Sequence, residues 1–226
     1  MVNPQITEND IKRSEVLRYL GYRGKRADDT VTELIDACIR ETLLVVQPRC
    51  IWRRFPLAFL EEDTMEAGGL VLKSRNLWKN LAGCTEVIYF AATLGNGVDR
   101  LMTQYGKLNI TKAAILQAAG AAAMEAYCDK CQMILEEELK KENLYLRPRF
   151  SPGYGDLPLA IQGRFLETIE ATKRAGIYLS DGNVMLPEKS VTAITGISSE
   201  DSHCLLAGCE VCGNTMCAYR RDTDTC

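Results

Sequence analysis

Residues 113–127 read AAILQAAGAAAMEAY, a stretch in which alanine and glycine dominate. Small side chains let other backbones approach a helix closely, so this stretch predicts a helix at the centre of the fold. Asn109 or Thr111 is a suitable N-cap. The pattern predicts one long helix from about Lys112 to Glu142.

The segments on either side of this helix alternate between helical and extended patterns. Apolar positions at helical spacing predict helices at residues 11–20 and 30–47, and Pro48 ends the second one. The short apolar run VIYFAA at residues 87–92 predicts a buried strand. Other strands are expected at 51–60, 69–72, 176–180 and 190–197, other helices at 75–81 and 162–171, and a turn at 181–183.

This mixed order of elements predicts an α+β fold. We expect a single domain, residues 1–197, with a twisted mixed or antiparallel sheet flanked by helices. A short cysteine-rich tail, residues 198–226, follows as a separate lobe.

Composition narrows the class of protein further. The 226 residues are 46% apolar and 25% charged, enough for one sizeable core. A net charge of −3 excludes the broad positive field that binding of nucleic acid requires. The polar N-terminus has no apolar signal-peptide core, and no apolar run is long enough to span a bilayer. We therefore expect a cytoplasmic protein with neither membrane nor nucleic acid as a partner.

The loop RPRFSPGYGDLPL at residues 147–159 carries the candidate binding chemistry. Pro152 and Gly153 suit the two central positions of a type II turn. Arg149 offers a planar fork for a carboxylate, and Tyr154 offers a π-face for a cation. Together these residues favour a small zwitterionic ligand. The alternative is an ordinary turn whose tyrosine packs on the core and whose arginine is solvated.

With these residues in view, the chain resembles the activation domain of cobalamin-dependent methionine synthase, in which an R-x-x-x-G-Y motif holds S-adenosylmethionine. Arg149, Gly153 and Tyr154 match that motif position by position. The chain is most similar to the short, free-standing members of the family, from about Trp52 to Gly196. The shared segments are FAATLGNGVDR (90–100), the small-residue helix ending in Met124-Glu125, RFSPGYGDLPL (149–159) and GIYLSDGNVMLPEKSVTAITG (176–196).

The resemblance implies a role for individual residues. Glu125 would contact the ammonium group of S-adenosylmethionine, Arg149 its carboxylate, and Ser151 with Gly153 the adenosine through backbone groups. For Glu125 the alternative is a solvated charge on the helix surface. The fused family members also use an acidic residue early in the domain, for which this chain has no assigned counterpart.

The function implied is that of a reactivation subunit, which presents S-adenosylmethionine for reductive methylation of a corrinoid. No cobalamin-, folate- or homocysteine-binding module is evident. We therefore expect the cobalamin on a partner methionine synthase or other corrinoid protein, with a low-potential electron donor such as flavodoxin or ferredoxin. Tyr154, as the catalytic residue, would lie next to the methyl group, with the strand Ser190-Val191-Thr192 facing the ligand. The chain would be a subunit of a methyltransferase rather than an enzyme alone.

Ten cysteines need a separate explanation in a reducing compartment. Cys38, Cys50 and Cys84 stand in apolar surroundings, where a thiol usually behaves as a small buried hydrophobe. Cys128 and Cys131 share one face of the long helix, and burial of that face is favoured over a redox pair.

The remaining five cysteines lie in the tail, and four of them cluster closely. Cys204, Cys209, Cys212 and Cys217 fall within fourteen residues, in a C-x4-C-x2-C-x4-C pattern that predicts an iron-sulfur cluster or a zinc ion. Unligated cysteines are the alternative, and His203 is a less favoured extra ligand. If the tail carries the active cluster, the chain would be an electron-transfer or corrinoid-reducing accessory protein. If the metal is structural zinc, the chain could be a non-enzymatic interaction module.

Overall fold

An antiparallel sheet of six strands organises the structure. The computed structural model describes residues 3–22 and 27–200. The strand order is β3-β2-β1-β4-β8-β5, and every neighbouring pair is antiparallel. The strands are β1 (Arg49–Glu61), β2 (Thr64–Ala67), β3 (Leu70–Lys73), β4 (Glu86–Thr93), β5 (Tyr145–Leu146) and β8 (Ser190–Ser198), and β6 (Tyr178–Leu179) pairs with β7 (Met185–Leu186) in a separate hairpin.

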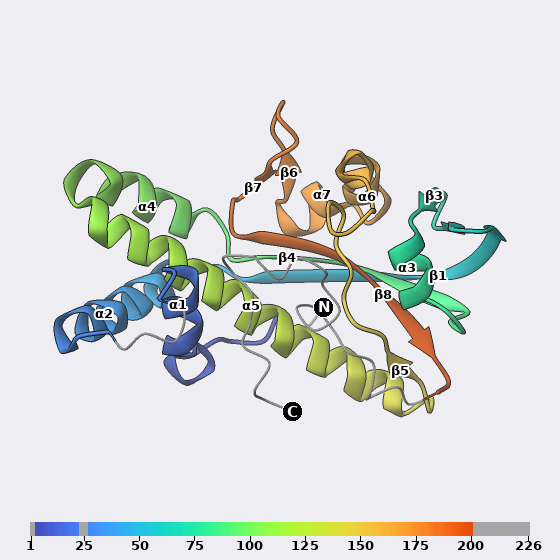
Figure 1. Cartoon of the computed structure of the whole chain (residues 1–226), viewed down its shortest axis with the longest axis horizontal. Helices are drawn as coiled ribbons and strands as arrows, with labels where there is room; N and C mark the ends of the chain where they lie inside the picture. Colours follow the sequence, from blue (N-terminus) through green and yellow to red (C-terminus); the bar gives the residue numbers. More distant parts are fainter. Residues whose placement is uncertain (1–2, 23–26, 201–226) are drawn as a thin grey trace.

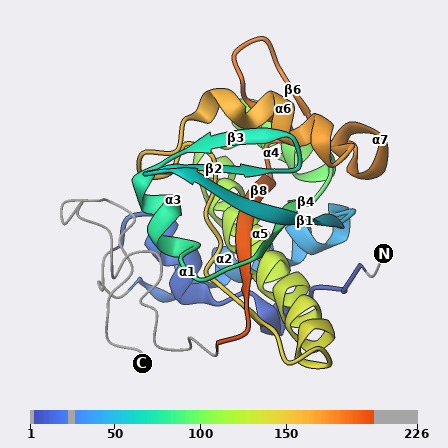
Figure 2. The ribbon, with the colours of Figure 1, turned by 90° about the vertical axis from the view of Figure 1, so that its right-hand side faces the viewer.

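Helices cover both faces of the sheet (Figures 1 and 2). One face packs on α1 (Arg13–Tyr19), α2 (Asp29–Val45), α4 (Gly97–Leu108) and α5 (Ile110–Lys140). The other packs on α3 (Arg75–Asn80), α6 (Gln162–Thr168) and α7 (Ala171–Ala175). Two short 3-10 helices, η1 (Glu8–Asp10) and η2 (Leu159–Ile161), complete the elements.

The central strand β4 shows why the sheet needs helices on both faces. Ile88 and Phe90 belong to the core under α5, while Val87 and Tyr89 belong to the core under α6. Alternate side chains of a strand point to opposite faces of the sheet. A strand that is apolar throughout must therefore be covered on both faces. The buried strand predicted at residues 87–92 is therefore confirmed.

The small residues of α5 also lie where the sequence predicts them. Asn109 caps the helix, its side chain accepting a hydrogen bond of 3.0 Å from the backbone N–H of Lys112. Ala118, Ala119 and Ala122 are buried against the sheet. The lack of bulk on this face lets α5 run along the sheet for 31 residues.

The predicted α+β class, with an antiparallel sheet flanked by helices, is confirmed, with differences in detail. The helix expected at 162–171 divides into α6 and α7, because Glu170 adopts a left-handed conformation with φ of 55°. The sequence analysis did not predict α4 or β2. Among the described helices, none combines the length and apolar character that a membrane crossing needs.

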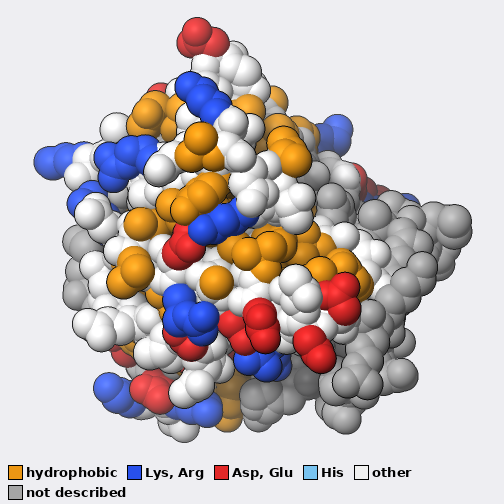
Figure 3. Space-filling model, turned by 90° about the vertical axis from the view of Figure 1, so that its left-hand side faces the viewer, with side chains coloured by type: hydrophobic (Ala, Val, Ile, Leu, Met, Phe, Trp, Pro, Cys, Tyr) orange, Lys and Arg blue, Asp and Glu red, His pale blue; other side chains and the backbone are white. Residues whose placement is uncertain are grey.

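The end of the molecule where α2 and α4 lie shows how charge is distributed on one face (Figure 3). Acidic and basic side chains are interspersed there with patches of hydrophobic atoms. Leu44, Leu108 and Ile110 are exposed hydrophobic residues of α2, α4 and α5. This face carries no broad field of a single sign, as the balanced composition predicts.

Candidate functional site

The candidate site begins where the chain leaves β5 and runs along the edge of β8. The N–H of Arg147 donates to the carbonyl of Gly196 at 2.9 Å, and Phe150 exchanges two hydrogen bonds of 2.8 Å with Ile194. Phe150 follows Arg147 by three residues, but their partners on β8, Gly196 and Ile194, are only two residues apart. The extra residue makes a β-bulge around Pro148, which has no N–H to donate.

The bulge sets the direction of Arg149. Phe150 packs on the α6 side of the sheet, so its neighbour Arg149 points to the other face, toward α5. There its Nη2 lies 2.6 Å from Oδ1 of Asp129 and 3.7 Å from Oε2 of Glu125. These two acids are four residues apart and share one face of α5. The structure thus brings the predicted Arg149 and Glu125 together.

Arg149 has hydrogen-bonding capacity to spare. Its side chain is only 21% exposed, and its Nη1 is buried without a partner in the described part of the chain. Burial lowers the pKa of Arg149, but nearby Cys128, Asp129 and Glu125 raise it by more, so the group stays charged. A buried N–H that lacks an acceptor is costly. Nη1 lacks such an acceptor among the described residues.

Glu125 provides the complementary charge. Its 3.7 Å separation from Arg149 is longer than a hydrogen bond, and its side chain is 36% exposed. Asp129, in contrast, is bonded directly to the guanidinium. A carboxylate that neighbours the arginine without being bonded to it can receive a cation. Arg149 and Glu125 together offer one group for each charge of a zwitterion.

The turn after Arg149 has the predicted geometry. The N–H of Tyr154 donates to the carbonyl of Ser151 at 3.0 Å, and Gly153 has φ of +85°. With Pro152 before the glycine, these are the features of a type II turn. Gly153 also donates its N–H to the carbonyl of Leu157 at 2.9 Å. The turn is therefore braced by the residues that follow it.

Asp156 fixes the far side of this loop to α3. Its carboxylate accepts hydrogen bonds from the Ser74 hydroxyl, from the N–H of Arg75 at 2.8 Å and from the N–H of Asn76 at 3.2 Å. Desolvation raises the pKa of Asp156, but these hydrogen bonds lower it by more, and the net pKa is below its usual value. The loop is thus held at both ends, by Phe150 on β8 and by Asp156 on α3.

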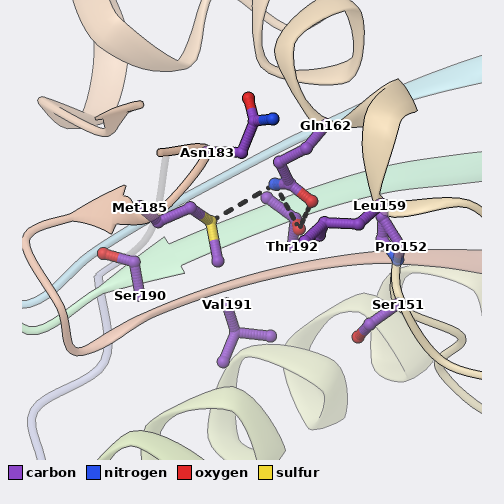
Figure 4. A pocket seen from close by; sticks show the side chains of 9 residues that line it. All are labelled: Ser151, Pro152, Leu159, Gln162, Asn183, Met185, Ser190, Val191 and Thr192. Atoms are coloured by element: carbon purple, nitrogen blue, oxygen red, sulfur yellow. Dashed lines mark hydrogen bonds between the residues drawn. The ribbon is translucent and has the colours of Figure 1, made fainter. Parts of the chain in front are cut away.

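A pocket of about 180 Å³ opens beside the turn, at the edge of β8 (Figure 4). It lies between the loop, α6, the β6–β7 hairpin and β8. Its lining residues are Ser151, Pro152, Leu159, Gln162, Asn183, Met185, Ser190, Val191 and Thr192. Ser151, predicted to contact the ligand, and the predicted strand 190–192 therefore line one space.

Tyr154 lies at the surface next to this loop. Its ring packs edge-on against Phe150 with the ring centroids 5.2 Å apart, and the residue is 40% exposed. Gly153 serves the turn through its backbone. The predicted role of Tyr154 at a methyl group stays a prediction.

Two neighbours of the site did not emerge from the sequence. Asp129 had a usable signal, since it follows Glu125 by one helical step of four residues. Gln162 had none, because only the tertiary fold brings the start of α6 over β8. Its buried amide forms hydrogen bonds inside the pocket.

The cysteines divide into those the structure describes and those it does not. The expected burial of Cys38, Cys50 and Cys84 is confirmed, as is that of Cys128 and Cys131. Cys204, Cys209, Cys212, Cys217 and His203 lie outside the described residues, so the tail metal stays a prediction. Within residues 3–22 and 27–200, no group of three or more His, Cys, Asp or Glu could hold a metal ion.

The fold and site together define a class: an α+β domain whose antiparallel sheet is covered by helices on both faces. A pocket lies at the edge of this sheet, next to a cluster of one arginine and two acidic residues. Among solved structures, the chain is similar to a crystal structure of the MetH reactivation domain bound to AdoHcy. The TM-score is 0.60 at 17% identity, over 80% of this chain and 70% of that one. No protein-family model and no curated protein matches the chain.

Proposed function

We propose that this chain binds S-adenosylmethionine and acts as a reactivation subunit for a cobalamin-dependent methionine synthase or a related corrinoid methyltransferase. The observation that carries the proposal is the Arg149 cluster, in which one guanidinium nitrogen is buried without a partner next to an available carboxylate. The similarity of fold to a reactivation domain that binds AdoHcy, the demethylated product of this ligand, supports the same conclusion.

The proposed pose assigns each end of the ligand to groups of matching chemistry. The ligand carboxylate accepts a hydrogen bond from Arg149 Nη1, and its ammonium group faces Glu125. Charge-assisted hydrogen bonds of this kind are about twice as strong as neutral ones. The adenosine end lies along Ser151 and Gly153 toward the pocket. Ser151 follows Arg149 by two residues, about 7 Å of extended chain, so one ligand can reach both regions.

The chain's residues position the methyl donor rather than react with it. S-adenosylmethionine supplies an electrophilic methyl group, and the reduced corrinoid of the partner supplies the nucleophile. Methyl transfer between them requires alignment and exclusion of water but no acid or base from this chain. Tyr154, exposed at the edge of the loop, is the residue we place next to the methyl group. The cobalamin and the electron donor would belong to other proteins.

Calorimetry with S-adenosylmethionine and AdoHcy tests the binding half of the proposal. Wild type should bind both, and Arg149→Ala should weaken both by about 10- to 100-fold, since it removes a charge-assisted pair. Arg40→Ala is the matched control, because Arg40 is exposed on α2. Absence of binding to wild type, or equal binding by wild type and Arg149→Ala, would rule out this site.

A further inference from the structure

The inner wall of the pocket contains an amide held in one orientation. Gln162, the first residue of α6, is only 2% exposed and faces Thr192 of β8. Its Nε2 lies 2.7 Å from Oγ1 of Thr192 and 3.3 Å from Sδ of Met185. The Thr192 hydroxyl lies 3.2 Å from Oε1 of the same amide. Figure 4 shows the nitrogen on the Met185 side and the oxygen on the opposite side.

Counting donors and acceptors shows what this wall offers a ligand. The amide nitrogen has two N–H groups, one directed at Thr192 and the other at the Met185 sulfur, a weak acceptor. The oxygen has two lone pairs, and the Thr192 hydroxyl uses one of them. One lone pair of Gln162 Oε1 therefore remains, and the pocket presents an acceptor.

Rotating the amide by half a turn would not serve equally well. The oxygen would then face the Met185 sulfur, which has no hydrogen to donate, and the amide would lose one of its hydrogen bonds. The arrangement around Gln162 thus favours a ligand that donates a hydrogen bond over one that accepts.

We propose that Gln162 recognises the exocyclic amine of the adenine base, with Oε1 accepting one of its N–H groups. This inference rests on the proposed binding of S-adenosylmethionine and names the group that selects its base. Leu159, Pro152 and Val191 line the same pocket and offer apolar surface to a flat ring. The backbone of Thr192 supports the placement. Ile194 directs its N–H and C=O to the edge of β8 that faces Phe150, and Thr192, two residues earlier, directs its own N–H and C=O to the same edge.

The proposal predicts discrimination at the six-position of the purine. S-inosylhomocysteine differs from S-adenosylhomocysteine in having a carbonyl oxygen where the amine stands. That oxygen would meet the acceptor of Gln162 and leave it unpaired. A site built to hydrogen-bond a ligand group rejects the analogue that lacks it, so we expect wild type to favour the adenosyl compound by about 10- to 100-fold.

Calorimetry with these two ligands tests the proposal. In Gln162→Met, which keeps the volume but removes the amide, the preference should fall to about twofold or less. Thr192→Val frees the amide to rotate, so it should also reduce the preference between the two compounds. Gln104→Met, at an exposed position of α4, is the control and should discriminate as wild type does.

The outcomes separate this inference from the proposed function. If wild type binds neither compound, the proposed function fails and the inference fails with it. If wild type binds both compounds equally, or if Gln162→Met discriminates as well as wild type, the inference is wrong while the ligand site stands. Circular dichroism checks that each variant is folded. If Gln162→Met does not fold, the comparison of wild type with Thr192→Val decides the matter.

Discussion

Arg149 illustrates how a single backbone irregularity can place a candidate binding side chain. Without the extra residue at Pro148, the regular alternation of the edge strand would direct position 149 toward the α6 side, away from Glu125 and Asp129. Bulges of this kind occur often beside active sites, where they redirect a side chain. The orientation of the Arg149 side chain thus depends on the bulge that precedes it and on its contacts with α5.

The first prediction concerns Asp129, which we regard as a positioning residue for Arg149. Asp129→Ala releases Nη2, so Nη1 is no longer held toward the ligand, and affinity for S-adenosylmethionine should fall about 3- to 10-fold. Asp129→Asn keeps an oxygen acceptor and should restore most of that affinity. Calorimetry on both variants measures the difference. Tighter binding by Asp129→Ala would instead identify Asp129 as a competitor of the ligand carboxylate.

The second prediction concerns the choice of arginine over lysine. Arg149→Lys keeps the positive charge but replaces a planar fork with a single ammonium point. Lysine cannot contact Asp129 and a ligand carboxylate through two separate nitrogens. We expect affinity for S-adenosylmethionine to fall about tenfold, with thermal stability close to that of wild type. Unchanged affinity in a calorimetric titration would mean that charge alone determines binding here.

At this scale, the sequence predicted the residues whose chemistry is local. Pro152 and Gly153 determine their turn by their own backbone preferences, so the turn was predictable. The partners of Arg149 are distant in sequence, and the motif alone could not identify Asp129. The Gln162–Thr192 pair spans thirty residues and depends on how α6 lies over β8. Such contacts require the tertiary structure.

Among the elements, α4 packs against α2 at very short range. A Cβ placed on Gly97, the first residue of α4, would lie 2.0 Å from the carbonyl oxygen of Val45, the last residue of α2. This approach is possible only for glycine at that position. The same helix contains Gly106, where a Cβ would meet nothing within 4 Å.

The third prediction uses these two glycines as a matched pair. Gly97→Ala forces α4 away from α2 and should lower the free energy of unfolding by about 2–3 kcal/mol. Gly106→Ala lies inside the helix without a clash, and alanine is the better helix former there, so it should stabilise by about 0.5–1 kcal/mol. Urea unfolding of both variants measures the two values. Equal stability of the two variants would contradict the packing described here.

The fourth prediction concerns the pH dependence of the link between the loop and α3. The pKa of Asp156 is lowered in the folded state from 3.8, so its stabilisation is complete above that value and is lost as the pH falls through the folded pKa. Asp156→Asn should reduce stability at neutral pH by about 1 kcal/mol, a modest value for an exposed carboxylate. The difference from wild type should shrink below about pH 4. Urea unfolding at several pH values measures it, and a difference independent of pH would contradict the assignment.

Prediction of the elements succeeded where the pattern was continuous. The apolar run of β4 predicts a strand and the small-residue stretch of α5 predicts a helix, and neither pattern favours another type of element. In contrast, α4 was missed although its sequence carries a usable signal, because Val98, Leu101, Met102 and Tyr105 recur at helical spacing and pack on the core. Its two glycines, which are weak helix formers, oppose that signal. The missed strand β2 had a usable signal: Gly68 and Gly69, with φ of 58° and 79°, form a two-residue hairpin turn between β2 and β3.

On the scale of the whole molecule, the two helical layers leave an edge of the sheet available. β8 is flanked by β4 on one side, but among the described residues its other side pairs only with the short β5, Arg147 and Phe150. The pocket occupies the remaining edge, and the Arg149 cluster lies next to it on α5. A ligand there would contact residues from the loop, α5, α6 and β8. A site assembled from so many elements binds well only when the entire domain is folded.

The fifth prediction addresses the reaction that this arrangement would serve. In the proposed pose, the methyl donor lies at a surface loop, and the proposal assigns no nucleophile to the described residues. We therefore expect no methyl transfer by the chain alone, and transfer when a corrinoid protein in its inactive cob(II)alamin form and a low-potential reductant are supplied under anaerobic conditions. Tyr154→Phe should slow the transfer more than it weakens binding, and Glu125→Gln should act chiefly through affinity. Glu137→Gln, at an exposed position of the same helix, is the control. The corrinoid absorption spectrum reports the rate.

An equal rate of methyl transfer without this chain would remove its proposed role, and methylation of a small molecule without any corrinoid would assign the chain a different role.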